Sequence, residues 1–205
     1  VTAHAADLTD PGAVIGLVQA AVQAHGGLDI LVTNNGGPAG GTFETTAPEA
    51  WNRAVDLTLL SAVNLIRAAL PHLKQSEAAS ILTVTSISVK QPIEGLHLSN
   101  VLRPAVVGLT KSLSRELGAA GIRANSILPG WTATERVDEI MAMRSAASGR
   151  SPDEEAAGIA RGVPLGRMAD PVEFGRVAAF MVSPAASYLS GAMIQLDGGA
   201  YAGLL

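Results

Sequence analysis

Three polar residues around one predicted strand could form a reactive site. Ser86 stands at the carboxyl end of a strand expected over 80–86, and Ser99 and Arg103 lie early in the helix expected after it. Ser99 and Arg103 are four residues apart, so a helix would place them on one face. An open α/β sheet binds its ligand outside the carboxyl ends of its strands, where two hydroxyls and a guanidinium are suited to holding a polar group. The structural alternative is that Ser86 ends the strand and Ser99 caps the helix.

A glycine-rich loop is a second candidate binding element. It runs over 34–41 and follows a strand predicted over 28–33, whose near-continuous apolar sequence is typical of a parallel strand buried on both faces. Glycines let the backbone approach a ligand closely. The alternative is an ordinary turn, since asparagine and glycine are common turn residues.

The elements that must position these residues alternate along the chain. We expect strands over 1–6, 28–33, 80–86, 122–128 and 193–196, with helices after Asp10-Pro11, over 48–73, from about Gly95 to Leu117 and after Asp170-Pro171. This alternation predicts a Rossmann-like α/β fold, a doubly wound parallel sheet with helices on both faces. Pro104 falls inside one expected helix, where it must kink the helix or free a carbonyl.

The segment 131–168 reads as an insertion that follows a strand end. It contains Ser151-Pro152-Asp153-Glu154, which predicts a helix start with a capping box. Such an insertion is a common lid over a pocket, although a surface excursion without a role is the alternative. Trp131, Met141 and Met143 indicate either an apolar substrate or packing within the lid.

Composition narrows the class of protein. The chain has 205 residues, 48% hydrophobic, which suits one domain over 1–205 with the lid at 131–168. A net charge of −4 without a basic patch, and an aromatic content of 3%, argue against nucleic acid as a partner. Cysteine is absent, no apolar run reaches the roughly 18 residues of a membrane span, and the four histidines lack metal-ligand spacing. We therefore expect a cytoplasmic protein with neither a membrane partner nor a metal.

In this order and spacing, several short motifs together resemble the short-chain dehydrogenase/reductase family. The resemblance covers nearly the whole chain and implies a nicotinamide cofactor, NADP or NAD. By it, Asp7 corresponds to the family's aspartate near the adenine, and Asn34 and Gly36 match two positions of its Asn-Asn-Ala-Gly motif. Arg123 to Gly130 resembles the strand that borders the nicotinamide. The implied cofactor-binding residues are Asp7, Asn34, Gly36, Arg103, Pro129, Gly130, Thr132 and Thr134.

The family's catalytic Asn, Ser, Tyr and Lys correspond here to Thr58, Ser86, Ser99 and Arg103, so only the serine is retained. The family's tyrosine donates a proton to the carbonyl oxygen, and an alkyl hydroxyl such as that of Ser99 is a far weaker acid. Arg103 keeps the positive charge and can hold ribose hydroxyls or an oxyanion, but it does not give up a proton. Thr58 has a hydroxyl and no amide. The chain reads as a divergent branch of the family.

Other groups could supply the proton. His97 lies two residues before Ser99 and has a suitable intrinsic pKa. Lys90 and Glu94 lie in the preceding loop, and a water chain held by Ser86, Ser99 and Arg103 is a further option. Tyr188 and Tyr201 belong to a segment that does not carry this role in the family.

The resemblance also implies that the chain opens at the family's third strand, without the first two strands and the glycine-rich phosphate loop. We expect roughly fifty further residues upstream, the size of two strands and a crossover helix. The residue that selects between NAD and NADP would lie among them.

The leading interpretation is an enzyme, an oxidoreductase that transfers hydride between a nicotinamide cofactor and a small-molecule carbonyl or alcohol, including 3-oxoacyl compounds as one class. Two alternatives remain open: a non-catalytic dinucleotide-binding or regulatory module, and a structural subunit of an oligomer. The resemblance implies a homo-oligomer, a dimer or tetramer.

Overall fold

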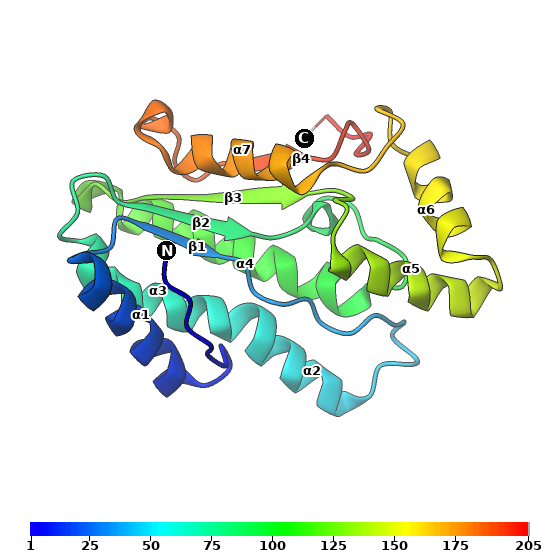
Figure 1. Cartoon of the computed structure of the whole chain (residues 1–205), viewed down its shortest axis with the longest axis horizontal. Coiled ribbons are helices and arrows are strands. Elements are labelled where there is room, and N and C mark those ends of the chain that lie inside the picture. The colour runs from blue at the N-terminus through cyan, green and yellow to red at the C-terminus, as the bar shows by residue number, and fades with distance from the viewer. Residues whose placement is uncertain (205) are drawn as a thin grey trace.

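Four parallel strands form the centre of the computed structural model, which describes residues 1–204 (Figure 1). They are β1 (Ile30–Thr33), β2 (Ser80–Val84), β3 (Arg123–Pro129) and β4 (Met193–Leu196), and their order in the sheet is their order in the chain. Ser80 pairs with both Ile30 and Arg123, and Ser126 pairs with Met193. The predicted parallel α/β sheet is confirmed.

Helices cover both faces of this sheet, as expected of a doubly wound fold (Figure 1). Neighbouring residues of a strand point to opposite faces, so Ile81 packs with helices α1 and α3 while Leu82 packs with α7. The helices are α1 (Pro11–His25), α2 (Pro48–Val55), α3 (Ser61–Leu73), α4 (His97–Glu116), α5 (Glu135–Ser148), α6 (Pro152–Arg161) and α7 (Pro171–Val182).

Local capping signals set the helix starts as predicted. Asp10 accepts a hydrogen bond from the Gly12 amide at 2.8 Å and begins α1. Ser151 and Glu154 form one capping box, and Asp170 and Glu173 form a second. Pro104 lies inside α4, which continues past it.

One prediction about regular structure was wrong. Residues 1–6 form no strand, because no described strand pairs with their backbone groups. All of them except Ala6 are exposed. The helix expected over 48–73 is confirmed as one continuous helical run, in which a π-helical segment, η1 (Asp56–Leu60), lies between α2 and α3.

The continuous helical run Pro48–Leu73 has the length and hydropathy of a membrane span, with a mean hydropathy of 1.4. Its last half nevertheless belongs to the core, because Leu65, Ile66, Ala69 and Leu73 are buried against the sheet. Such a pattern is typical of the central helix of an α/β layer.

Candidate active site

Ser86 lies just beyond the carboxyl end of β2 and begins a short 3₁₀ turn, Ile87–Val89. Its Oγ accepts a hydrogen bond from the Ser88 amide at 3.0 Å. That bond uses an oxygen lone pair and leaves the hydroxyl proton for a ligand. Ser86 therefore ends the strand, as the structural alternative predicts, and its hydroxyl can still donate a hydrogen bond to a ligand.

Arg103 reaches the same strand end from helix α4. Its Nη1 donates to the Val84 oxygen at 3.0 Å, and its Nε is buried with no hydrogen-bond partner in residues 1–204. Burial, and secondarily repulsion from Arg136, lowers the pKa of Arg103 to about 10. At neutral pH the guanidinium is therefore a half-buried cation, and no carboxylate of the described chain forms a salt bridge with it.

Ser99 occupies the third residue of α4, whose N-cap is Leu96. The expectation that Ser99 caps the helix is therefore wrong. Ser99 is half-buried, and its hydroxyl has no hydrogen bond to any other described residue. Its place one turn before Arg103 puts both side chains on one helix face.

Thr58 lies within the π-helix η1, which contacts α4. Its side chain is buried, and its Oγ1 is without a hydrogen-bond partner within residues 1–204. π-Helical segments are frequent at functional sites. An unsatisfied buried hydroxyl in one marks a place for a water or a ligand atom.

The segment at the end of β3 carries four of the predicted cofactor-binding residues. Thr132 is buried and its Oγ1 also lacks a partner in the described chain, whereas Thr134 is exposed and serves as N-cap of α5. The Gly130 amide donates to the Leu196 oxygen at 2.9 Å. A Cβ at Gly130 would lie 2.7 Å from the Asp197 Cα, so this position requires glycine. Pro129 is the last residue of the strand.

The loop after β1 exposes the two residues that the resemblance assigns to the cofactor and buries the asparagine between them. Asn34 and Gly36 are exposed, while Asn35 is buried and its Nδ2 donates to the Ser61 Oγ. The alternation of β1, with Leu31 and Thr33 buried, continues through Asn35. That alternation was the signal that could have singled out Asn35.

Asp7 is exposed and forms a tight turn at the start of the chain. Its Oδ1 accepts hydrogen bonds from the Thr9 hydroxyl at 2.7 Å and the Thr9 amide at 2.8 Å. These bonds lower the pKa of Asp7. Its place near an adenine stays a prediction.

Helix α5, in the segment 131–168, packs directly on the glycine-rich loop over 34–41. Arg136 Nη2 donates to the Pro38 oxygen at 2.7 Å. A Cβ at Gly40 would lie 2.4 Å from the Met143 sulfur. Gly37 and Gly40 of this loop thus make room for side chains of α5.

The alternative proton donors are dispersed. His97 packs edge-on against Phe43 and Trp51, at centroid distances of 5.5 and 5.2 Å, two residues away from Ser99 and hence on another helix face. The Lys90 ammonium lies over the Tyr201 ring, 5.6 Å from its centroid. Sequence reasoning did not connect these two residues, which are far apart in the chain.

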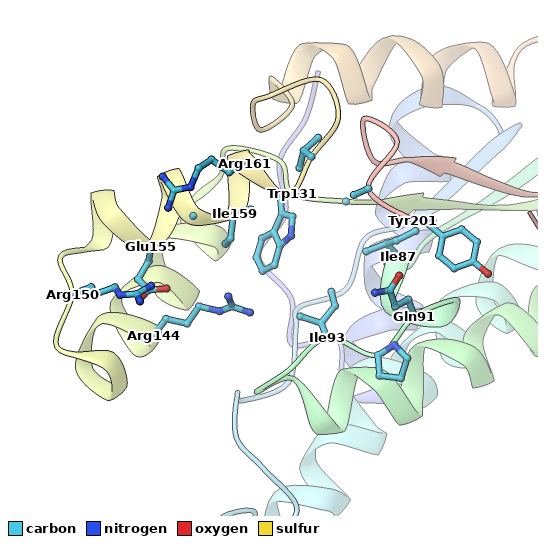
Figure 2. A pocket seen from close by; sticks show the side chains of 16 residues that line it. Ile87, Gln91, Ile93, Trp131, Arg144, Arg150, Glu155, Ile159, Arg161 and Tyr201 are labelled. Carbon is cyan, nitrogen blue, oxygen red and sulfur yellow. The ribbon is translucent and has the colours of Figure 1, made fainter. Parts of the chain in front are cut away.

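A cavity of about 580 Å³ adjoins the strand end that carries Ser86 (Figure 2). Ile87, the residue after Ser86, lines it together with Gly130, Trp131 and Tyr201. The cavity therefore connects the ends of β2 and β3 with the lid helices.

These groups fit the nicotinamide end of a dinucleotide. Arg103 is tied to the end of β2 through Val84, Thr132 follows the end of β3, and Thr58 lies on η1, which contacts the helix of Arg103; Arg103 Nε, Thr132 Oγ1 and Thr58 Oγ1 have no partner within residues 1–204. An open α/β sheet binds its ligand at these strand ends. Ribose hydroxyls and a carboxamide would satisfy such donors and acceptors.

Comparison with known proteins identifies the family. A family model described as "Enoyl-(Acyl carrier protein) reductase" matches residues 1–201. The 3-alpha-(or 20-beta)-hydroxysteroid dehydrogenase of Mycobacterium tuberculosis is 36% identical over 198 residues, covering 97% of this chain and 70% of that protein.

Two solved structures share the fold. The L-sorbose reductase of Gluconobacter frateurii, in complex with NADPH and L-sorbose, has a TM-score of 0.90 at 28% identity, covering 98% of this chain and 76% of that one. An NADPH-bound short-chain oxidoreductase of Pseudomonas aeruginosa with an atypical catalytic centre has a TM-score of 0.86 at 29% identity, covering 97% and 75%. The chain belongs to the short-chain dehydrogenase/reductase family of NAD(P)-dependent oxidoreductases.

Proposed function

We propose that this protein reduces a ketone with Ser86 and Arg103 as its catalytic residues, in place of the family's Ser, Tyr and Lys. The observation that carries the proposal is the half-buried Arg103 guanidinium, which Nη1 fixes to the strand end beside Ser86 while the buried Nε has no partner among residues 1–204. A bound reduced nicotinamide supplies the hydride. The Ser86 hydroxyl donates to the carbonyl oxygen and orients it.

Arg103 stabilises the negative charge that develops on that oxygen. A preorganised cation in a buried site acts strongly on developing charge, because little solvent screens it. Arg103 remains protonated, so the proton that completes the alcohol comes from water rather than from the guanidinium. Thr58 and Ser99, whose hydroxyls have no partner among the described residues, are suited to holding that water.

NADPH is the cofactor we propose to test first, because the solved relatives with 28% and 29% identity contain it. We propose that Gly130, Thr132, Thr134 and Pro129 border the nicotinamide, and that Asn34, Gly36 and Asp7 lie along the adenosine side. 3-Oxoacyl thioesters are one proposed substrate class, consistent with the description of the family model.

The test is turnover of NADPH or NADH by the purified protein with a panel of ketones and acetoacetyl-CoA. We expect ketone-dependent oxidation of the cofactor, with a kcat that Ser86→Ala lowers by about 100-fold. Cofactor binding without oxidation of NAD(P)H on the whole panel would contradict the proposal and favour a non-catalytic dinucleotide-binding module. Activity that appears only when an active relative is added would favour a structural subunit.

We also propose a cytoplasmic homo-oligomer, dimer or tetramer. Val172 and Phe180 on α7 and Met193 on β4 are exposed apolar side chains, which suit a subunit interface. Sedimentation of the purified protein tests this, and a single monomeric species would contradict it.

A further inference from the structure

One wall of the cavity beside Ile87 carries an excess of positive charge. Arg144, Arg150 and Arg161 line it with a single carboxylate, Glu155, so three positive charges against one negative leave a net charge of two. The chain as a whole has a net charge of −4, so this cavity departs in sign from the rest of the protein.

None of these three arginines forms a salt bridge within the part of the chain that the structure describes. The salt bridges within residues 1–204 are Arg136–Glu139 and Arg167–Glu173, neither of which involves the cavity. The Glu155 Oε1 instead accepts a hydrogen bond from the Ser148 hydroxyl at 2.7 Å. Glu154, which acts electrostatically on Arg150, accepts a hydrogen bond from the Ser151 amide in its capping box.

Arg144 is the member best placed to meet a ligand. Its guanidinium lies over the Trp131 ring, 5.3 Å from the centroid, and extends toward Ile93 (Figure 2). One further contact, from Nη2 to the Glu94 oxygen, is long at 3.5 Å. The remaining donors of this half-buried side chain are available to an anion. Arg150 and Arg161 are exposed at the rim.

The polarity of the cavity changes across its width. The arginines come from α5, α6 and the turn that joins them on one side, whereas Ile87, the residue after Ser86, lies on the other (Figure 2). Trp131, Ile93 and Ile159 lie between these two sides. A molecule that fills this space has an apolar middle, one end beside Ser86 and the other end against arginines.

We propose that the substrate is an amphipathic anion, a ketone whose apolar body carries a carboxylate or a phosphate, and that Arg144 binds this anionic group. Arginine suits either group, because its planar donors match both carboxylate and phosphate oxygens. This inference rests on the proposed ketone reduction for the orientation of the carbonyl. The binding of the anionic group is a separate property.

Three matched probes test it: 4-benzoylbenzoate, 4-benzoylphenyl phosphate and the neutral methyl 4-benzoylbenzoate. Binding is measured by calorimetry and turnover by NADPH oxidation, so the two proposals have separate readouts. We expect at least one anion to bind about tenfold more tightly than the ester, the effect of one charge-assisted contact. The tighter of the two anions identifies carboxylate or phosphate as the preferred group.

Variants of residues that line the cavity test whether the cavity causes the preference for an anion over the ester. Arg144→Gln reduces the ratio of anion to ester affinity to near one, and Arg150→Gln and Arg161→Gln reduce it by about threefold or less, since exposed charges are screened. Glu155→Gln raises the ratio, because it removes the cavity's carboxylate and keeps an oxygen for Ser148. Arg67→Gln, an exposed position on α3 outside the cavity, leaves the ratio unchanged.

The outcomes separate the two proposals. Anion preference that depends on Arg144, without turnover, supports this inference and contradicts the ketone reduction. Turnover without preference for either anion, or a preference that Arg144→Gln does not change, overturns this inference and leaves the reduction intact. Failure of all three probes to bind also overturns it. The ratio of anion affinity to ester affinity is taken within each variant, so it does not change if part of the protein is misfolded.

Discussion

Arg103 Nη1 donates to the main-chain oxygen of Val84 at 3.0 Å, and this bond ties helix α4 to the strand end that carries Ser86. The bond uses one of the five guanidinium N–H groups, and the buried Nε has no partner within the described chain. The protein thus holds a cation in a fixed position with donors left over. That arrangement suits a ligand that brings oxygen atoms.

We expect Arg103→Gln to lower kcat/KM by about 100-fold. The substitution removes the positive charge that stabilises the negative charge developing on the carbonyl oxygen. Arg103→Lys keeps the charge but loses the planar fork, so its activity lies between those of Gln and the parent. Steady-state kinetics measures both, and Tm shows whether each variant folds. Equal activity of the parent and Gln variants would contradict the catalytic role.

Ser86→Ala removes the hydroxyl that we assign to the carbonyl oxygen. We expect kcat to fall by about 100-fold, with a stability loss of about 1 kcal/mol from the missing turn cap. Ser112→Ala on the same helix as Arg103 is the matched control, because Ser112 is exposed and its hydroxyl donates to the Gly108 oxygen of its own helix, and we expect it to change kcat by less than about threefold. The assignment fails if the two variants lose kcat equally.

Tyr201 is a tyrosine that lines the cavity, and replacing it tests which group donates the proton. In Figure 2 its hydroxyl end points away from Trp131 and Ile87. We therefore expect Tyr201→Phe to retain kcat within about threefold. A loss of about 100-fold, with a changed pH profile of kcat, would instead identify Tyr201 as the proton donor.

Gly130→Ala tests the close approach of the β3 and β4 ends. The added Cβ would lie 2.7 Å from a main-chain atom of Asp197, which cannot move aside as a side chain can. We expect a loss of about 1–3 kcal/mol in the free energy of unfolding. The control is Gly16→Ala in α1, where nothing lies within 4 Å of the new Cβ and up to about 1 kcal/mol is gained. Denaturant unfolding measures both variants.

Glu173 makes the stability of the α7 start depend on pH. Its hydrogen bond from Arg167, and secondarily that from the Asp170 amide, lowers its pKa from 4.5 to about 2. A lowered folded-state pKa stabilises the fold above the unfolded-state pKa, and this contribution is lost as pH falls from 4.5 toward 2. The parent is therefore more stable than Glu173→Gln near neutral pH, and thermal unfolding should show this difference shrinking below pH 4.5. A difference independent of pH would contradict it.

Much of the fold was predictable because its signals are local. Asp10 before Pro11, and the capping boxes at Ser151 and Asp170, fix helix starts through bonds within three residues. The apolar strands and the four-residue spacing of Ser99 and Arg103 need nothing beyond the chain's own periodicity. The predicted strand over 1–6 failed because a strand also needs a paired neighbour, which the described sheet does not give it.

The site depended on contacts between segments that are distant in the chain. The sequence alone placed Ser86 at a strand end and Arg103 on the following helix, and its resemblance indicated the family. Only the tertiary structure decided that Arg103 bonds Val84 and that Thr58 lies in a π-helix. It also decided that Asn35 rather than Asn34 is buried, and that Arg144 stacks on Trp131. The physical reason is that crossover connections and side-chain packing set these distances, and local propensity does not encode them.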